Sequence, residues 1–97
     1  MYRISEKAIA DLEEIWIYTF KNWSFEQADR YYHSIISEIE FIANNPSLGK
    51  SMGHVKEGYR ASEVKSHLIF YKTGIDNIVE VVRILYQRMD IENRLND

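Results

Sequence analysis

The chain has 97 residues, of which 45% are hydrophobic and 28% are charged, values typical of one globular domain that folds in water. Its net charge is −3 and it contains no cysteine, which excludes disulfides, thiolate zinc sites and cysteine nucleophiles. No apolar run approaches the roughly 20 residues needed to cross a bilayer, and residues 1–6 lack the features of a secretory signal. We therefore expect a single cytoplasmic domain over residues 1–97.

The charges are unevenly distributed along the chain. Residues 1–48 carry eight acidic and four basic side chains, whereas residues 49–97 carry seven acidic and eight basic ones. Between residues 50 and 72, five basic side chains accompany only two acidic ones. This positive patch is weak beside those of dedicated nucleic-acid binders, so we expect no direct sequence-specific nucleic-acid binding.

The N-terminal residues predict a short strand followed by a helix. Residues 2–4 are β-like, and the Ser5 hydroxyl is placed to cap a helix that begins near residue 6. The apolar residues that follow recur at helical spacing and form one stripe, which we expect to be buried. They are Ala8, Leu12, Ile15 and Trp16.

A second helix is predicted from Ser24 onward. Ser24 and Gln27 have the spacing of a capping box, and Trp23 is placed to pack on Ala28 as a hydrophobic staple. Pro46 ends this helix, and the short connection to the first helix favours an antiparallel pair. The apolar stripe of the second helix, also expected to be buried, consists of Tyr32, Ile35, Ile39 and Ile42.

The C-terminal half changes to β patterning. Residues 47–58 contain three of the four glycines and predict a surface loop. Residues 59–65, 67–72 and 78–86 are rich in β-branched and aromatic side chains and predict three antiparallel strands, the last of them central because it is apolar on both faces. Residues 88–97 are compatible with a short helix. We expect an α+β fold in which the N-terminal strand and an antiparallel helical hairpin accompany a small antiparallel sheet.

No motif for a metal, a cofactor or a nucleophile appears. His33, His54 and His67 fall on a helix, a loop and a strand with no pair at ligand spacing. No serine sits in a Gly-x-Ser-x-Gly elbow, and the glycines match no nucleotide-binding loop. Glu38 and Glu40 are interpreted as solvent-facing helix charges. We expect no metal and no cofactor.

Arg60, Arg83 and Tyr86 are the candidate functional residues. Arginine is costly to bury in a strand, so it requires either a carboxylate partner inside the protein or an anionic ligand outside it. The sequence leaves these alternatives open. Tyr86 closes its strand, where a tyrosine is more often half-buried packing.

Several segments together resemble a known family. In chain order they are Tyr2-Arg3-Ile4-Ser5, Ala8, Asp11-Leu12, Ile15-Trp16-Ile17-Tyr18-Thr19, Trp23, Gln27-Ala28, Asn45-Pro46, Gly49, Gly58-Tyr59-Arg60, His67, Ile69-Phe70-Tyr71, Val82-Arg83-Ile84-Leu85 and Gln87-Arg88-Met89-Asp90. In this order they resemble the ParE toxins of the ParE/RelE superfamily over residues 2–95. Tyr86 departs from the pattern, because many relatives have histidine there.

The resemblance implies the toxin of a type II toxin-antitoxin pair. Such a toxin is neutralised by a small ParD-like antitoxin that docks a helix and an extended segment, and its usual target is DNA gyrase. A toxin of this branch acts by binding and not by catalysis, so no catalytic residue is expected. On this resemblance, the residues expected to bind partners are Arg60, His67, Arg83, Tyr86 and Met89.

Two alternatives stay open. RelE-type relatives cut messenger RNA on the ribosome without a metal, and Arg60, Arg83 and Tyr86 would then supply the cationic and acid-base groups. The chain is poor in the clustered cations that such chemistry requires, and its long helical hairpin looks more like the gyrase-directed branch. A degenerate member that only binds an antitoxin is the other alternative.

Overall fold

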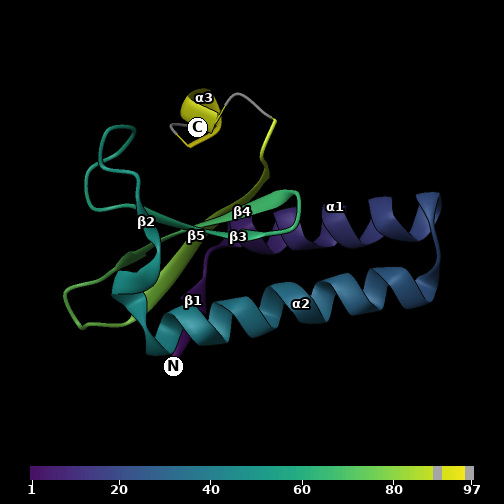
Figure 1. Cartoon of the computed structure of the whole chain (residues 1–97), viewed down its shortest axis with the longest axis horizontal. Helices are drawn as coiled ribbons and strands as arrows, with labels where there is room; N and C mark the ends of the chain where they lie inside the picture. Colours follow the sequence, from purple (N-terminus) through teal and green to yellow (C-terminus); the bar gives the residue numbers. More distant parts are fainter. Residues whose placement is uncertain (89–90, 96–97) are drawn as a thin grey trace.

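The computed structural model describes residues 1–88 and 91–95 and has an α+β fold. Two long helices form an antiparallel hairpin, a five-stranded sheet lies beside them, and a short third helix lies across the sheet from α2 (Figure 1). The elements are β1 (Tyr2–Ile4), α1 (Glu6–Asn22), α2 (Phe25–Asn44), the 3-10 helix η1 (Pro46–Leu48), β2 (Lys50–Ser51), β3 (Arg60–Val64), β4 (His67–Thr73), β5 (Val79–Tyr86) and α3 (Ile91–Leu95).

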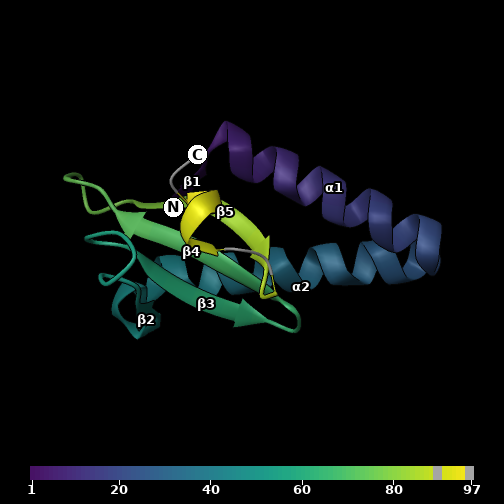
Figure 2. The ribbon, with the colours of Figure 1, turned by 90° about the horizontal axis from the view of Figure 1, so that it is seen from above.

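Both long helices begin at the serine caps expected from the sequence. Ser5 accepts a hydrogen bond from the Ala8 amide at 3.1 Å, and Ser24 accepts one from the Gln27 amide at 3.0 Å. Each cap satisfies an amide that the first helical turn would otherwise leave unpaired. α2 ends just before Pro46 starts the 3-10 helix. The predicted hairpin is therefore confirmed, and its tip extends beyond the sheet (Figure 2).

The sheet is mixed, with strand order β1-β5-β4-β3-β2. β3, β4 and β5 form the predicted antiparallel meander, in which β5 is an interior strand and β4 is the middle one. β1 pairs in parallel with the start of β5, and β2 adds an antiparallel strand to β3. The parallel pairing of β1 differs from the expected antiparallel sheet, and β2 lies in the segment that was expected to be an irregular loop. The difference arises because segments of two or three residues are too short to show a period.

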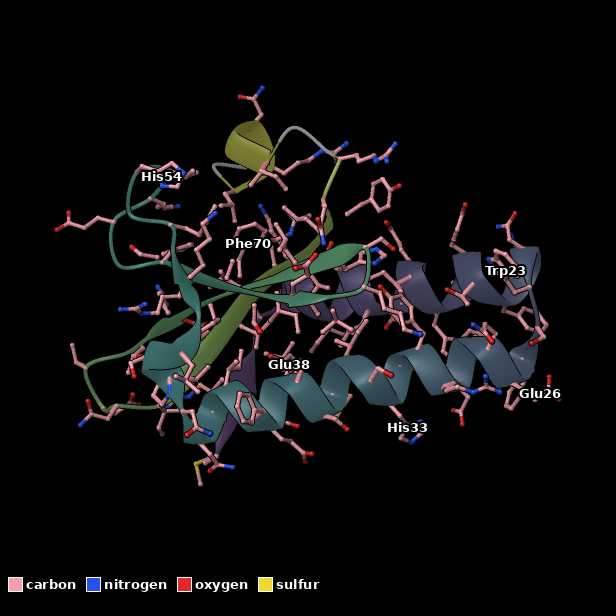
Figure 3. The ribbon with its side chains drawn as sticks, viewed as in Figure 1. Trp23, Glu26, His33, Glu38, His54 and Phe70 are labelled. Carbon is pink, nitrogen blue, oxygen red and sulfur yellow. The ribbon has the colours of Figure 1, made fainter. Side chains whose placement is uncertain are left out.

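Apolar side chains pack on both faces of the sheet. On the hairpin side, Ile35 and Ile39 are fully buried and Leu12 is nearly so, whereas Trp16 is only partly buried. On the other side, Phe70 packs with a smaller cluster that includes Leu95 of α3 (Figure 3). The hairpin and α3 thus cover opposite faces of one sheet, and this arrangement positions the site described below.

Tyr32, expected in the buried stripe of α2, is 39% exposed, and two further hairpin side chains lie differently from expectation. Trp23 does not staple onto Ala28, because it is the C-cap of α1 with a non-helical backbone, and its side chain is 75% exposed at the hairpin tip (Figure 3). Glu38 does not face solvent, since it points toward the sheet and accepts a hydrogen bond from the Ser62 hydroxyl (Figure 3). A buried Ile at the next position keeps α2 pressed on the sheet at this point.

Candidate functional site

A cleft of about 700 Å³ opens where the hairpin meets one end of the sheet. Exposed aromatic side chains line it, namely Tyr18, Trp23 and Tyr86. Its walls come from α1, α2, the β3–β4 turn, the end of β5 and α3. The lining residues are Asp11, Glu14, Ile15, Tyr18, Thr19, Trp23, Gln27, Tyr31, Lys65, Ser66, His67, Arg83, Ile84, Leu85, Tyr86 and Arg94.

Arg83 is held by a carboxylate of the same chain. Its Nε and Nη2 donate to the two oxygens of Asp11 on α1 at 2.9 and 3.1 Å, and its Nη1 donates to the Arg94 carbonyl at 3.0 Å. The side chains of Arg83 and Asp11 are only 15% and 11% exposed. The first of the two alternatives left open by the sequence therefore holds for Arg83, because its partner is internal.

Asp11 also completes the edge of β5. The parallel pairing with β1 ends at Ile4 opposite Val81, and within residues 1–88 and 91–95 no other strand pairs with β5 on that side. Beyond this point, the Asp11 carboxylate accepts a hydrogen bond from the Ile84 amide at 2.9 Å. One carboxylate thus satisfies a strand amide and an arginine together, and it joins α1 to β5.

His67 and Tyr31 form a second polar group in the cleft. The Tyr31 hydroxyl donates to the Val64 carbonyl at 3.0 Å and lies 2.6 Å from His67 Nδ1. Which of the two groups donates in the contact between the hydroxyl and Nδ1 depends on the tautomer of the imidazole. The Tyr86 ring packs edge-on against the imidazole, with ring centres 5.7 Å apart.

Burial sets the titration of this pair. Desolvation lowers the pKa of His67 below its usual 6.5, and the charge of Asp11 opposes only part of that shift. Desolvation also raises the pKa of Tyr31 above its usual 10.0. Both side chains are therefore neutral at pH 7, because desolvation is the larger effect on each pKa.

The lowered pKa of His67 predicts a loss of stability in mild acid. The unfolded chain binds a proton at His67 more readily than the folded chain does, so the free energy of unfolding falls as the pH drops below about 6.5. We expect the denaturant midpoint of His67→Gln to vary less than that of the original chain between about pH 7.5 and about pH 5.5. His33→Gln, at an exposed position, is the control and should leave the pH profile unchanged. An equal change of the denaturant midpoint with pH in the original chain and in His67→Gln would contradict the prediction.

Arg60 lies outside the cleft and has a structural contact. Its guanidinium donates to the Gly49 carbonyl at 2.7 Å. The Tyr71 hydroxyl accepts from the Gly49 amide at 2.9 Å and donates to the Pro46 carbonyl at 2.8 Å. A Cβ at Gly49 would lie 2.1 Å from that hydroxyl oxygen, so this close approach needs glycine. Arg60 therefore helps to fasten the segment after α2 to the sheet.

The cleft brings together three of the five predicted partner-binding residues, His67, Arg83 and Tyr86. Arg60 is not among its lining residues, and Met89 lies outside the described residues. Sequence reasoning missed Asp11 and Tyr31 as site residues, because their partners lie 72 and 36 residues away. The one sequence signal for Asp11 was its place among the segments that carry the family resemblance.

The site has no metal-binding cluster among the residues that the structure describes. Within 1–88 and 91–95, no group of three or more histidine, aspartate and glutamate side chains is arranged to hold a metal ion. None of the helices in these ranges has the length and apolar composition needed to cross a membrane.

Comparisons with known proteins agree on one family. The family model described as ParE toxin of type II toxin-antitoxin system, parDE, matches residues 2–91. Toxin ParE1 of Mycobacterium tuberculosis (strain ATCC 25618 / H37Rv) is 37% identical over 94 residues, covering 97% of this chain and 96% of the relative. Toxin ParE1 of Caulobacter vibrioides is 38% identical over the same coverage. Toxin ParE of Escherichia coli is 30% identical over 96 residues, covering 99% of this chain and 93% of the relative.

A solved structure shares the fold. The chromosomal ParDE TA system from P. aeruginosa contains a chain that superposes with a TM-score of 0.73, covering 89% of this chain and 96% of that chain. The two sequences are 18% identical. The similarity therefore concerns the arrangement of helices and strands and leaves the side chains of the cleft to be judged from this structure.

Proposed function

This chain belongs to the ParE toxin family of the parDE type II toxin-antitoxin system, and we propose that it acts by binding DNA gyrase until a ParD-type antitoxin neutralises it. The observation that carries a binding mechanism is the internal pairing of Arg83 with Asp11. A metal-independent nuclease needs cations free to stabilise the charge on the reacting phosphate. Arg83 instead donates to Asp11 and to the Arg94 carbonyl of the same chain, and Arg60 lies outside the cleft.

The antitoxin is proposed to cover the cleft. Tyr18 and Trp23 are 66% and 75% exposed on its wall, and large exposed aromatic side chains are typical of surfaces that a partner buries. Lys65 and Arg94 add positive charge to the rim. A partner segment with apolar anchors and acidic neighbours fits this combination.

Replacing Trp23 tests the position of the antitoxin. We expect Trp23→Ala to weaken binding of the small protein encoded beside this chain by about tenfold or more, because a buried tryptophan anchor commonly carries more than 1 kcal/mol of binding energy. Isothermal titration calorimetry measures this directly. Phe41→Ala removes a half-exposed aromatic side chain of α2 that does not line the cleft, and it should bind normally. Equal affinities for Trp23→Ala and Phe41→Ala would contradict a binding site at the cleft.

Parallel activity assays test the target. The purified chain is incubated with gyrase and supercoiled plasmid, and separately with translating ribosomes and a reporter message. Gyrase poisoning predicts accumulation of cleaved plasmid in the first assay and an intact message in the second. Cuts in the message with unaffected gyrase would overturn the proposal, and silence in both assays would favour a member that only binds its antitoxin.

The ribonuclease alternative keeps one observation in its favour. His67 and Tyr86 are in contact inside the cleft, and Nε2 of the imidazole would be a proton acceptor in the tautomer whose Nδ1 donates to Tyr31. In such an enzyme this nitrogen would take a proton from the attacking ribose hydroxyl. Among the described residues that line the cleft, Lys65 and Arg94 are the cations left to stabilise the resulting charge, since Arg83 is paired with Asp11.

Tyr86→Phe separates the two mechanisms. If the chain binds gyrase, we expect growth inhibition to survive this substitution, because one phenol hydroxyl adds little to a broad protein interface. If the chain is a nuclease that uses Tyr86 in proton transfer, the cleavage rate should fall roughly a hundredfold or more. The measurement is growth after induction, with thermal melting as the control for folding. Complete loss of toxicity with normal melting would contradict the binding mechanism.

A further inference from the structure

The turn between β3 and β4 holds a lysine in a backbone conformation that favours glycine. The two strands pair up to Val64 opposite His67, so Lys65 and Ser66 form a two-residue hairpin loop. Lys65 has a φ of 52°, which lies in the left-handed region, and loops of this length commonly place glycine, asparagine or aspartate there. Because a Cβ strains the backbone in this region, glycine would fill the position of Lys65 with less strain.

The other side chain on a left-handed backbone has an ordinary explanation. Within residues 1–88 and 91–95, only Lys65 and Asn77 combine a side chain with a positive φ. Asparagine adopts the left-handed region readily, and Asn77 lies in the β4–β5 turn, where its amide donates to the Gly74 carbonyl at 3.0 Å. Lysine has no such preference. A residue that is held in a disfavoured conformation is a candidate for a function of its side chain.

Hydrogen bonds from Gln87 hold this turn in place. The side-chain amide of Gln87 donates to the Lys65 carbonyl at 2.8 Å and to the Glu63 carboxylate at 2.6 Å. Its backbone amide donates to the Ser66 carbonyl at 2.9 Å. These bonds join the turn to the residue that directly follows β5, so the surrounding structure keeps Lys65 in position despite the strain.

The Lys65 ammonium lies at the rim of the cleft. It sits over the ring of Tyr31, 5.6 Å from the ring centre, and Lys65, Tyr31 and His67 all line the cleft. None of the ion pairs among the residues that the structure describes involves Lys65, whereas Arg83 is paired with Asp11. The turn therefore presents to the cleft a cation that no ion pair within the described ranges neutralises.

We propose that Lys65 binds a carboxylate side chain of the ParD-type antitoxin in the cleft, an assignment that rests on the proposed function. A carboxylate that reaches the ammonium forms a charge-assisted hydrogen bond, and aromatic side chains around it exclude water and strengthen the contact. A nucleic-acid strand is a poorer occupant, because its successive phosphates need a track of cations. Among the described residues that line the cleft, Arg94 is the one other basic side chain that is not bound to Asp11.

Three substitutions test the binding role by calorimetry with the small protein encoded beside this chain. Lys65→Gly removes the ammonium and Lys65→Arg keeps a positive charge. Lys56→Gly removes a lysine that lies 5.3 Å from the ring centre of Tyr59 and does not line the cleft. We expect Lys65→Gly to weaken binding about tenfold, and the other two variants to bind within about threefold of the original chain. Equal weakening by Lys56→Gly would indicate general attraction to positive charge and would overturn the site.

The outcomes separate this site from the proposed function. If the original chain does not bind the neighbouring protein, the antitoxin contact is rejected and the Lys65 site with it. If the original chain binds and Lys65→Gly binds equally well, the Lys65 site alone is rejected. Loss of toxicity in Lys65→Gly with unchanged affinity for the neighbouring protein would assign the ammonium to the target of the toxin or to a nucleic acid, and would also overturn the proposal.

Thermal melting of the free chain tests the strain without any partner. Lys65→Gly should melt about 2 °C or more above the original chain, because glycine adopts the left-handed region without steric cost. Lys56→Gly changes a residue outside that region and should melt at or below the original temperature. Higher stability together with weaker binding in Lys65→Gly would support a lysine retained for its partner. A lower melting temperature of Lys65→Gly would show that the side chain stabilises the fold and would overturn the proposal.

Discussion

Replacing Arg83 by alanine is expected to lower the free energy of unfolding by about 3 kcal/mol or more. The substitution removes both hydrogen bonds to Asp11 and the one to the Arg94 carbonyl. It also leaves the Asp11 carboxylate, 11% exposed, without its counter-charge. An unpaired charge in such a place costs more than the pair itself contributes, because its desolvation is no longer offset. Urea unfolding followed by circular dichroism measures the change.

An exposed ion pair of this chain provides the matched control. Arg3 donates to Asp76 at 2.7 Å, and the two side chains are 56% and 41% exposed. Because water screens this pair, Arg3→Ala should leave the denaturant midpoint almost unchanged. In addition, the loss caused by Arg83→Ala together with Asp11→Ala should be smaller than the sum of the two single losses. Additive losses, or an effect of Arg83→Ala no larger than that of Arg3→Ala, would show that the pair does not stabilise the fold.

The hairpin could be predicted from the sequence because its signals are local. Ser5 and Ser24 each cap a helix through an amide three residues away, and Pro46 limits the second helix. The apolar stripe of α2 identified Ile35 and Ile39, which are fully buried. All of these depend on neighbours within one or two helical turns, which is the range over which a sequence pattern is readable.

The candidate site was less predictable because it is made of distant contacts. The sequence left open whether the partner of Arg83 is internal, and Asp11 lies 72 residues away from it along the chain. The parallel pairing of β1 with β5 creates the open strand edge that Asp11 fills, and three residues of strand give no sign of it. Arg60 likewise donates a hydrogen bond to a backbone carbonyl, that of Gly49. No pattern of side chains in the sequence predicts such a contact.

Truncating Ile39 to alanine should lower the free energy of unfolding by roughly 2 to 5 kcal/mol. Ile39 is fully buried in the cluster that joins α2 to the sheet, so its lost methyl and methylene groups leave a cavity that close-packed neighbours fill only in part. Ile75→Ala removes the same atoms from a fully exposed isoleucine in the β4–β5 turn and should change stability by less than about 0.5 kcal/mol. The two variants are compared by the midpoints of their denaturant unfolding curves, at equal dependence of the free energy of unfolding on denaturant. Because hairpin and sheet share this core, similar midpoints for Ile39→Ala and the original chain would mean that the hairpin does not pack on the sheet in solution.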